Sequence, residues 1–342
     1  MSELNRQWRL ARRPVGMVEE SCFSLHETPV PEPGPGEIVV RNCYLSFEPA
    51  MRGWIEDAPS YLPPVAIGEV MRASAVGQVV ASSNDDFPVG QCVSGLFGWQ
   101  DYALIQPGGL TTPTPVPADV ALTHVLSVLG MTSVTAYFGL LDLGDPQPGE
   151  TVVVTGAAGA TGSIAAQIAR LKGCRVVGTA GGPEKTRWLR EEAKLDAVID
   201  YKREDVATRL GELCPGGINV AFDNVGGETL DAILVHIAQN ARVVLCGMIS
   251  QYNDEELQPQ LRHVRNLVTR RGRMEGFIVL DYLARTAEAM TALQGWLASG
   301  ELAFQEDIQQ GMEQVPRTFL RLFRGENLGK QLCQIAEPPL GR

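Results

Sequence analysis

The stretch from Thr151 to Gly173 constrains the fold of this chain more than any other segment. It opens with an apolar, β-branched run at 152–154, which is typical of a buried parallel strand. A glycine-rich turn follows from Gly156 to Gly162, and a helix is predicted to begin near Ser163. A strand, a glycine-rich turn and a helix in this order are typical of the first βα unit of a dinucleotide-binding fold. In that unit, the turn and the helix N-terminus present N–H groups to a pyrophosphate. The alternative is a tight βα turn in another α/β protein.

Length, charge and cysteine usage narrow the class of protein. The chain has 342 residues, enough for two domains, and its net charge of −11 disfavours nucleic acid as a partner. No run approaches 18 apolar residues and the N-terminal segment has no signal-peptide pattern, so we expect no membrane partner and a cytoplasmic location. The seven cysteines contain no C-x-x-C spacing, which disfavours a disulfide framework and a zinc cluster.

Two kinds of pattern divide the chain near residues 120–128. Before it, frequent Pro and Gly separate short β-like runs, which predicts a compact, mostly antiparallel β domain. After it, strands alternate with helices, which predicts a parallel, doubly wound sheet and thus an α/β fold. The predicted strands are 38–45, 77–82, 91–97, 152–154, 175–179, 197–200, 218–223, 241–246, 274–280 and 330–335, and the main helices are 184–194, 205–213, 228–237, 282–299 and 315–323.

The end of the second parallel strand indicates which nicotinamide cofactor binds. An NAD site places an acid there for the ribose hydroxyls, but residues 178–182 read G-T-A-G-G. Lys185 follows in the first turn of a helix, where free N–H groups also favour a phosphate. This pattern favours NADP(H), with Tyr201 and Lys202 closing the same pocket. The alternative for Lys185 is a solvated surface lysine.

Motifs for other chemistries are missing from the sequence. The four histidines, at 26, 124, 236 and 263, form no zinc-binding pattern, so no metal site is predicted. There is no G-x-S-x-G elbow and no phosphate-binding G-x-x-x-x-G-K-[ST] loop. Hydride transfer needs neither, only a dry, orienting pocket and stabilisation of charge on the acceptor oxygen.

Two segments carry a resemblance to a known family. Phe222–Glu228 reads F-D-N-V-G-G-E and Cys246–Asn253 reads C-G-M-I-S-Q-Y-N. Together with further segments, they resemble the zinc-independent medium-chain dehydrogenase/reductases, in particular the branch of prostaglandin reductase (leukotriene B4 12-hydroxydehydrogenase) and curcumin/alkenal reductase. The further segments are 51–53, 68–71, 135–141 and 327–331.

The resemblance implies an architecture and an activity. It implies a GroES-like catalytic domain at 1–125, an NADP-binding Rossmann domain at 126–300 and a C-terminal return to the catalytic domain at 301–342, in a homodimer. The implied activity is metal-free, NADPH-dependent reduction of the C=C bond of α,β-unsaturated ketones and aldehydes, by hydride transfer to the β-carbon. The alternatives are an NADPH quinone oxidoreductase on the same fold and a non-catalytic NADPH-binding protein.

The resemblance also implies roles for individual residues. The pyrophosphate would lie on Gly159, Ala160, Thr161 and Gly162, and Lys185 and Tyr201 would bind the 2′-phosphate. Tyr252 would also be catalytic, with its phenol hydrogen-bonded to the enolate; the alternative is a packing role. Residues expected around the ribose and nicotinamide are Asn224, Cys246, Gly247, Ile249, Ser250, Tyr252, Phe277, Val279 and Asn327.

The chain departs from the family pattern at the expected substrate pocket. Residues 48–50 read E-P-A, where the family has an aromatic before Met51. Ala50 would therefore line a wider or differently shaped pocket beside Tyr252. Residues 131–133 also differ from the usual Met-Pro-Gly. Arg52 is either an active-site charge or part of a structural salt bridge.

Overall fold

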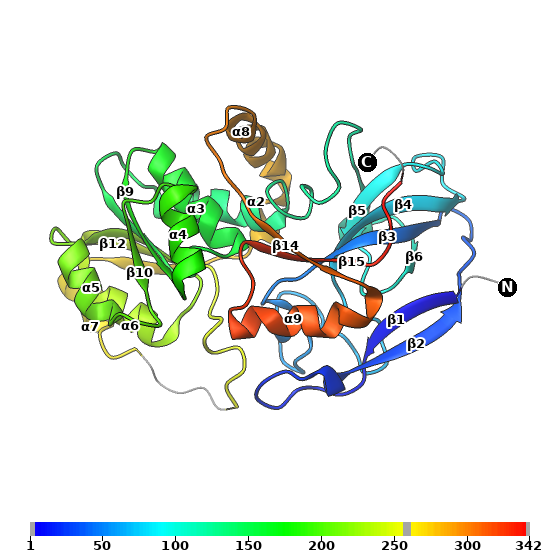
Figure 1. Ribbon diagram of the computed structural model, residues 1–342, viewed down its shortest axis with the longest axis horizontal. Helices are drawn as coiled ribbons and strands as arrows, with labels where there is room; N and C mark the ends of the chain where they lie inside the picture. Colours follow the sequence, from blue (N-terminus) through cyan, green and yellow to red (C-terminus); the bar gives the residue numbers. More distant parts are fainter. Residues whose placement is uncertain (1–3, 256–260, 340–342) are drawn as a thin grey trace. The chain divides into compact units, whose positions relative to one another are not determined.

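The computed structural model describes residues 4–255 and 261–339 (Figure 1). They form two compact units, one from the chain up to residue 126 and from 306 onward, the other from residues 127–305. We call these unit 1 and unit 2 and describe each by itself.

Unit 2 is built on a six-stranded parallel sheet in the order β10-β9-β8-β11-β12-β13. This confirms the predicted doubly wound sheet. Strand order reverses between β8 and β11, and ligands of such sheets bind beyond the carboxyl ends of the strands at that point. The strands are β8 (Thr151–Val154), β9 (Arg175–Ala180), β10 (Ala197–Asp200), β11 (Ile218–Asp223), β12 (Ile237–Leu245) and β13 (Arg273–Gly276).

Helices connect and cover these strands. Val153 of β8, Val177 of β9 and Val243 of β12 share one buried cluster with Leu210 of α5 and Ile233 of α6. The strand residues beside Val153 are fully buried as well, as expected for a parallel sheet that helices cover on both faces. The helices of unit 2 are α2 (Met131–Phe138), the π-helix η3 (Gly139–Gly144), α3 (Ala160–Leu171), α4 (Pro183–Glu191), α5 (Val206–Leu213), α6 (Gly227–Val235), α7 (Arg265–Thr269), the 3-10 helix η4 (Val279–Arg285) and α8 (Thr286–Ala298).

Some predicted boundaries in unit 2 are wrong. Helix α3 begins at Ala160, not near Ser163, because small residues in the turn can already adopt helical backbone angles. The strand predicted over 274–280 ends at Gly276, and the helix predicted from Tyr282 begins at Thr286. The intervening η4 continues the apolar pattern in a tighter helix, which hydrophobic periodicity does not resolve.

Unit 1 contains a mostly antiparallel sheet in the order β14-β15-β3-β4-β5-β7, with β6 also pairing with β3. A separate antiparallel pair is formed by β1 and β2. The strands are β1 (Leu4–Leu10), β2 (Phe23–Pro29), β3 (Ile38–Ser46), β4 (Ser74–Ser82), β5 (Cys92–Leu96), β6 (Tyr102–Ile105), β7 (Thr114–Pro115), β14 (Glu306–Gln310) and β15 (Lys330–Gln334). The helices are η1 (Glu20–Cys22), α1 (Met51–Trp54), η2 (Gly109–Thr111), η5 (Met312–Gln314) and α9 (Val315–Arg324).

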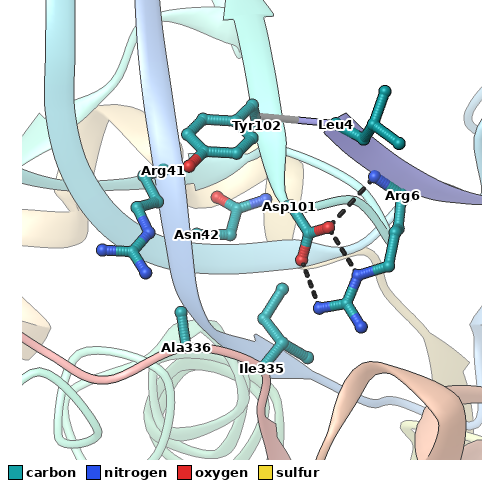
Figure 2. Close-up of a pocket in the computed structure, with 8 residues that line it drawn as sticks. All are labelled: Leu4, Arg6, Arg41, Asn42, Asp101, Tyr102, Ile335 and Ala336. Atoms are coloured by element: carbon teal, nitrogen blue, oxygen red, sulfur yellow. Dashed lines mark hydrogen bonds and ion pairs between the residues drawn. The ribbon is translucent and has the colours of Figure 1, made fainter. Parts of the chain in front are cut away.

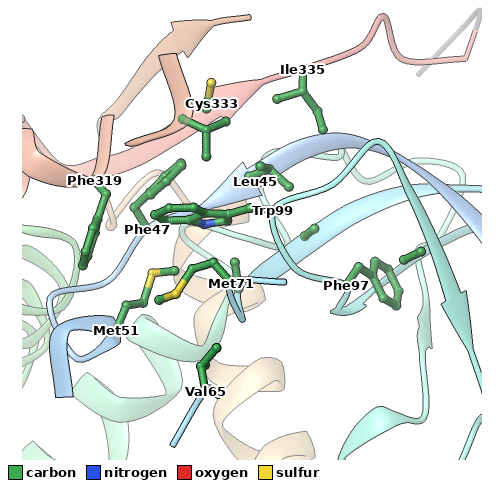
Figure 3. Close-up of a cluster of buried hydrophobic side chains, with 14 of the residues drawn as sticks. Leu45, Phe47, Met51, Val65, Met71, Phe97, Trp99, Phe319, Cys333 and Ile335 are labelled. Atoms are coloured by element: carbon green, nitrogen blue, oxygen red, sulfur yellow. The ribbon is translucent and has the colours of Figure 1, made fainter. Parts of the chain in front are cut away.

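Trp99 lies at the centre of the unit 1 core (Figure 3). Its ring centroid lies 4.9 Å from that of Phe23, and 5.6 Å from those of Phe47 and Phe319. Phe319 belongs to α9, so residues from both ends of the chain complete one core.

Five strands of unit 1 were not predicted from the sequence: β1, β2, β6, β7 and β14. The strand β14 reads E-D-I-Q-Q, and only one of its residues is apolar. It forms because β15 supplies parallel hydrogen-bond partners for its whole length. Pairing between strands distant in sequence leaves no local pattern to read.

Candidate functional site

The turn between β8 and α3 carries the residues predicted to hold the pyrophosphate, and its backbone is closely packed. Gly156 has a φ of +57°, and a Cβ on Gly162 would lie 2.4 Å from the carbonyl oxygen of Gly156. Glycine is therefore required at Gly162 by close backbone approach. Gly159 is the N-cap of α3, so the N–H groups of Ala160, Thr161 and Gly162 lie in its first turn, where helices leave them unpaired.

The residues predicted for the 2′-phosphate lie around the carboxyl end of β9. Lys185 is in the first turn of α4, which begins at Pro183 after Gly182. Tyr201 follows β10, and its ring lies over Gly181: a Cβ there would be 2.6 Å from the phenol oxygen. Burial, with a smaller contribution from Asp200, raises the pKa of Tyr201, so its phenol keeps its proton at neutral pH.

Asp223 connects the ends of β8 and β11, the two strands between which the strand order reverses. It is fully buried, and its Oδ1 accepts from Thr155 Oγ1 at 2.6 Å while its Oδ2 accepts from the Gly226 N–H at 2.9 Å. Thr155 also accepts two hydrogen bonds from Asn224. Its Oγ1 accepts from the Asn224 N–H at 2.8 Å, and its carbonyl oxygen accepts from Asn224 Nδ2 at 2.7 Å. Burial raises the pKa of the Asp223 carboxyl. The sequence analysis missed Thr155 and Asp223, although both adjoin a predicted strand end.

The loop after β12 is tied to the same point. The carbonyl of Asp223 accepts from the N–H groups of Cys246 at 2.8 Å and Gly247 at 3.1 Å. Ile249 N donates to the Asn224 carbonyl at 3.2 Å, and Ser250 Oγ donates to the Val225 carbonyl at 2.6 Å. Five predicted residues, Asn224, Cys246, Gly247, Ile249 and Ser250, therefore share one hydrogen-bonded assembly at the carboxyl edge of the sheet.

Tyr252 folds back over this loop. Its phenol oxygen accepts from the Met248 N–H at 3.1 Å, and a Cβ on Gly247 would lie 3.2 Å from that oxygen. The hydroxyl therefore has a fixed position beside the loop backbone. Cys246 is partly buried, and burial, followed by the charge of Asp223, raises the pKa of its thiol to about 12.

Phe277, beyond β13, packs into the π-helix η3. A Cβ on Gly139 would lie 2.3 Å from the Phe277 ring and 2.9 Å from that of Phe222. Val279 begins η4, two residues later. The absence of a side chain at Gly139 therefore makes room for the Phe277 ring. Such π-helical turns are frequent at functional sites.

The other two predicted residues, Ala50 and Asn327, belong to unit 1. Ala50 is the N-cap of α1 and packs partly buried against the core. Asn327 Nδ2 donates to the Gly329 carbonyl at 3.0 Å. The buried Lys330 pairs with Glu48 at 2.6 Å, which joins the segments that carry these two residues.

Arg52 is structural in this fold. It is buried, pairs with Glu56 at 2.7 Å and donates to the Gly16 carbonyl at 3.1 Å. The salt-bridge alternative for Arg52 is therefore the one observed.

A small cavity of about 210 Å³ lies elsewhere in unit 1 (Figure 2). The Asp101 carboxylate in its wall accepts from Arg6 Nε at 2.8 Å, and Arg41 and Asn42 flank it. None of the predicted site residues lines this cavity. Among the described residues, no group of three or more His, Cys, Asp and Glu side chains is arranged to hold a metal ion.

Comparison with known proteins assigns the family. The model for the N-terminal domain of oxidoreductase matches residues 6–112, and the model for zinc-binding dehydrogenase matches residues 160–295. The NADPH-dependent curcumin reductase of Escherichia coli is 41% identical over 97% of this chain and 97% of its own length. The chain belongs to the zinc-independent medium-chain dehydrogenase/reductases. It is an oxidoreductase, as predicted.

Two further relatives agree with this family. The NADP⁺-dependent 2-alkenal reductase of Nicotiana tabacum is 36% identical, covering 97% of this chain and 98% of its own. The crystal structure of CurA from Vibrio vulnificus in complex with NADPH is 40% identical, with a TM-score of 0.92, covering 97% of this chain and 100% of its own. The predicted cofactor, NADP(H), is thereby confirmed at the level of the family. Within the part of the chain that the structure describes, no helix is long and apolar enough to cross a membrane.

Proposed function

We propose that this protein reduces the C=C bond of α,β-unsaturated ketones and aldehydes with NADPH. The observation that carries the proposal is the hydrogen-bonded assembly at the carboxyl edge of the unit 2 sheet, where Tyr252 presents a fixed hydroxyl beside the loop after β12. Relatives that cover nearly the whole chain are named curcumin and 2-alkenal reductases, which supports the same reaction class.

The residues of unit 2 fit NADP(H). The Gly156–Gly162 turn leaves no room for a Cβ at Gly162, which suits close approach of a pyrophosphate. Residues 178–182, at the end of β9, contain no acid, and Lys185 and Tyr201 offer a cation and a protonated phenol instead. We assign the ribose and nicotinamide to Asn224, the loop from Cys246 to Tyr252, Phe277 to Val279, and Asn327.

Bound NADPH would supply the hydride that reduces the β-carbon. The task of the chain is to orient the acceptor and to stabilise negative charge on its carbonyl oxygen. A tyrosine hydroxyl can both accept and donate, so Tyr252 can accept from the Met248 N–H and act as a donor to the enolate oxygen. Ala50, small where relatives of this branch carry an aromatic, would leave space for a bulky acceptor.

We assign the catalytic role to residues 1–125, the NADP-binding role to 126–300, and a return to the catalytic domain to 301–342. We further propose a homodimer located in the cytoplasm. Light scattering combined with size-exclusion chromatography tests the dimer, and a molar mass of one chain would contradict it.

The decisive experiment measures NADPH oxidation with a panel of enones, enals and quinones, with analysis of the products. We expect saturated ketones and aldehydes as products. Alcohols formed by carbonyl reduction alone would overturn the proposal. Turnover restricted to quinones would favour the quinone oxidoreductase alternative, and NADPH binding without any turnover would indicate a binding protein.

A further inference from the structure

Asp200 joins two loops at the carboxyl edge of the sheet. It ends β10 and is only 7% exposed. Its Oδ1 accepts from the Gly182 N–H at 2.9 Å and from the Lys202 N–H at 3.1 Å, while its Oδ2 lies 3.8 Å from Arg203 Nε. Since one oxygen holds N–H groups from both loops, the loop after β9 and the loop after β10 are fixed to each other.

Gly181 adds a steric requirement at the same corner. A Cβ at this position would lie 2.6 Å from Tyr201 Cζ and 2.9 Å from Lys202 Cε. The phenol and the lysine side chain therefore lie directly over the end of β9. In NAD enzymes of this fold, the acid that binds the ribose 2′-hydroxyl occupies the end of this strand.

We infer that Asp200 is a positioning residue that, together with the missing side chain at Gly181, sets the preference for NADPH over NADH. The inference rests on the proposed use of NADPH and extends it to residues that do not themselves bind the phosphate. Asp200 holds the backbone of Lys202, and with it the loop that carries Tyr201, at the strand end that an acid would otherwise occupy. A cation and a hydroxyl donor there favour a 2′-phosphate over a 2′-hydroxyl.

An opposite effect of Asp200 is conceivable, because a carboxylate near a 2′-phosphate repels it. The two effects predict different behaviour of two variants. If repulsion dominates, Asp200→Ala and Asp200→Asn both strengthen phosphate binding. If positioning dominates, Asp200→Ala weakens binding, whereas Asp200→Asn retains it because the amide oxygen can accept from the same two N–H groups.

The test is calorimetric titration of the full chain with adenosine 2′,5′-bisphosphate and with AMP. We expect Asp200→Ala to weaken binding of the bisphosphate about tenfold and to leave AMP within about twofold, since only phosphate contacts are displaced. Asp200→Asn should stay close to the unaltered chain. Equal behaviour of the two variants, or an unchanged ratio of the two affinities in Asp200→Ala, would overturn the inference.

Asp196 provides a matched control. It precedes β10, and its Oδ2 accepts from the Val176 N–H of β9 at 2.7 Å, so it makes the same kind of bridge at the opposite end of the strand. Asp196→Ala should change stability without changing the ratio of the two affinities. A shift in that ratio as large as that of Asp200→Ala would show that general loosening of the sheet is responsible.

Gly181→Ala tests the position of Tyr201 and Lys202 without altering Asp200. The added methyl group should displace Tyr201 and Lys202, weaken bisphosphate binding and spare AMP; equal loss for both ligands would contradict the inference. These titrations require no turnover, so a protein that reduces no enone can still pass them. A chain that binds the bisphosphate no better than AMP would instead overturn the assignment of NADPH itself.

Discussion

Tyr252 is the residue on which the proposed chemistry depends most. Tyr252→Phe removes the hydroxyl but keeps the ring beside Gly247. We expect kcat for an enone to fall about 10²-fold, which is typical for loss of one donor to a developing oxyanion. The dissociation constant of NADPH, measured by fluorescence, should change far less than kcat, because the ring of residue 252 and the rest of the loop remain.

A matched control is Tyr137→Phe, since the Tyr137 hydroxyl bonds Glu288 at 3.2 Å, away from the loop. That variant should keep full turnover. Full turnover of Tyr252→Phe would instead show that the phenol is not the donor to the enolate.

Cys246 contributes its backbone to the site, and its thiol should be inert. With a pKa of about 12, the thiol is almost entirely protonated at pH 8, whereas an ordinary cysteine is partly ionised. The thiolate is the reactive form, so iodoacetamide should leave Cys246 unmodified in the native protein at pH 8 and alkylate it after unfolding. The measurement is peptide mass spectrometry. Rapid alkylation of the native protein would contradict the raised pKa of this thiol.

At the scale of elements, the packing of Phe277 against the π-helix η3 predicts that Gly139 tolerates no larger residue. Gly139→Ala places a methyl group against Phe277 and Phe222, so we expect a loss of about 1–3 kcal/mol in the free energy of unfolding. Displacement of Phe277 should also raise the dissociation constant of NADPH. Urea unfolding and fluorescence titration measure the two effects.

Gly295 in α8 is the matched control, because a Cβ there meets nothing within 4 Å. Gly295→Ala should stabilise the protein by about 0.5–1 kcal/mol, through helix propensity alone. If both alanines had the same effect, the close approach of Phe277 to Gly139 would be wrong.

Elements with a strong local pattern were predictable from the sequence. The run Val152–Val154 is a buried strand, and the glycine turn after it opens a helix, as the sequence predicts. The short strand β14 was not predictable, because its pairing with β15 is its main support. Among site residues, Asp223 was missed because its role depends on three strand ends meeting, and linear spacing cannot show that.

At the scale of the whole molecule, unit 1 is closed by both ends of the chain. β15 pairs antiparallel with β3, and Phe319 of α9 packs edge-on against Trp99. The strand at 330–335 and the helix at 315–323 were predicted in place, but local patterns contain no information on the partner of either. The expectation that the tail returns to the first domain came from the resemblance to a family, and the pairing of β15 with β3 had no signal of its own in the sequence.

Phe319→Ala tests how far unit 1 depends on its C-terminal segment. Phe319 is fully buried, and its ring also contacts Phe23 and Phe323 at centroid distances of 6.3 and 5.1 Å. Removing a buried phenyl ring leaves a cavity, so we expect a loss of about 3–5 kcal/mol in the free energy of unfolding, measured in urea by tryptophan fluorescence.

Val268→Ala is the control for that measurement, because Val268 is 78% exposed and should change stability by less than about 0.5 kcal/mol. Adenosine 2′,5′-bisphosphate should bind both variants as it binds the unaltered chain, since Phe319 lies in unit 1 and the proposed phosphate site lies in unit 2. A Phe319→Ala protein as stable as the Val268→Ala protein would mean that the C-terminal helix is not part of the core that holds Trp99.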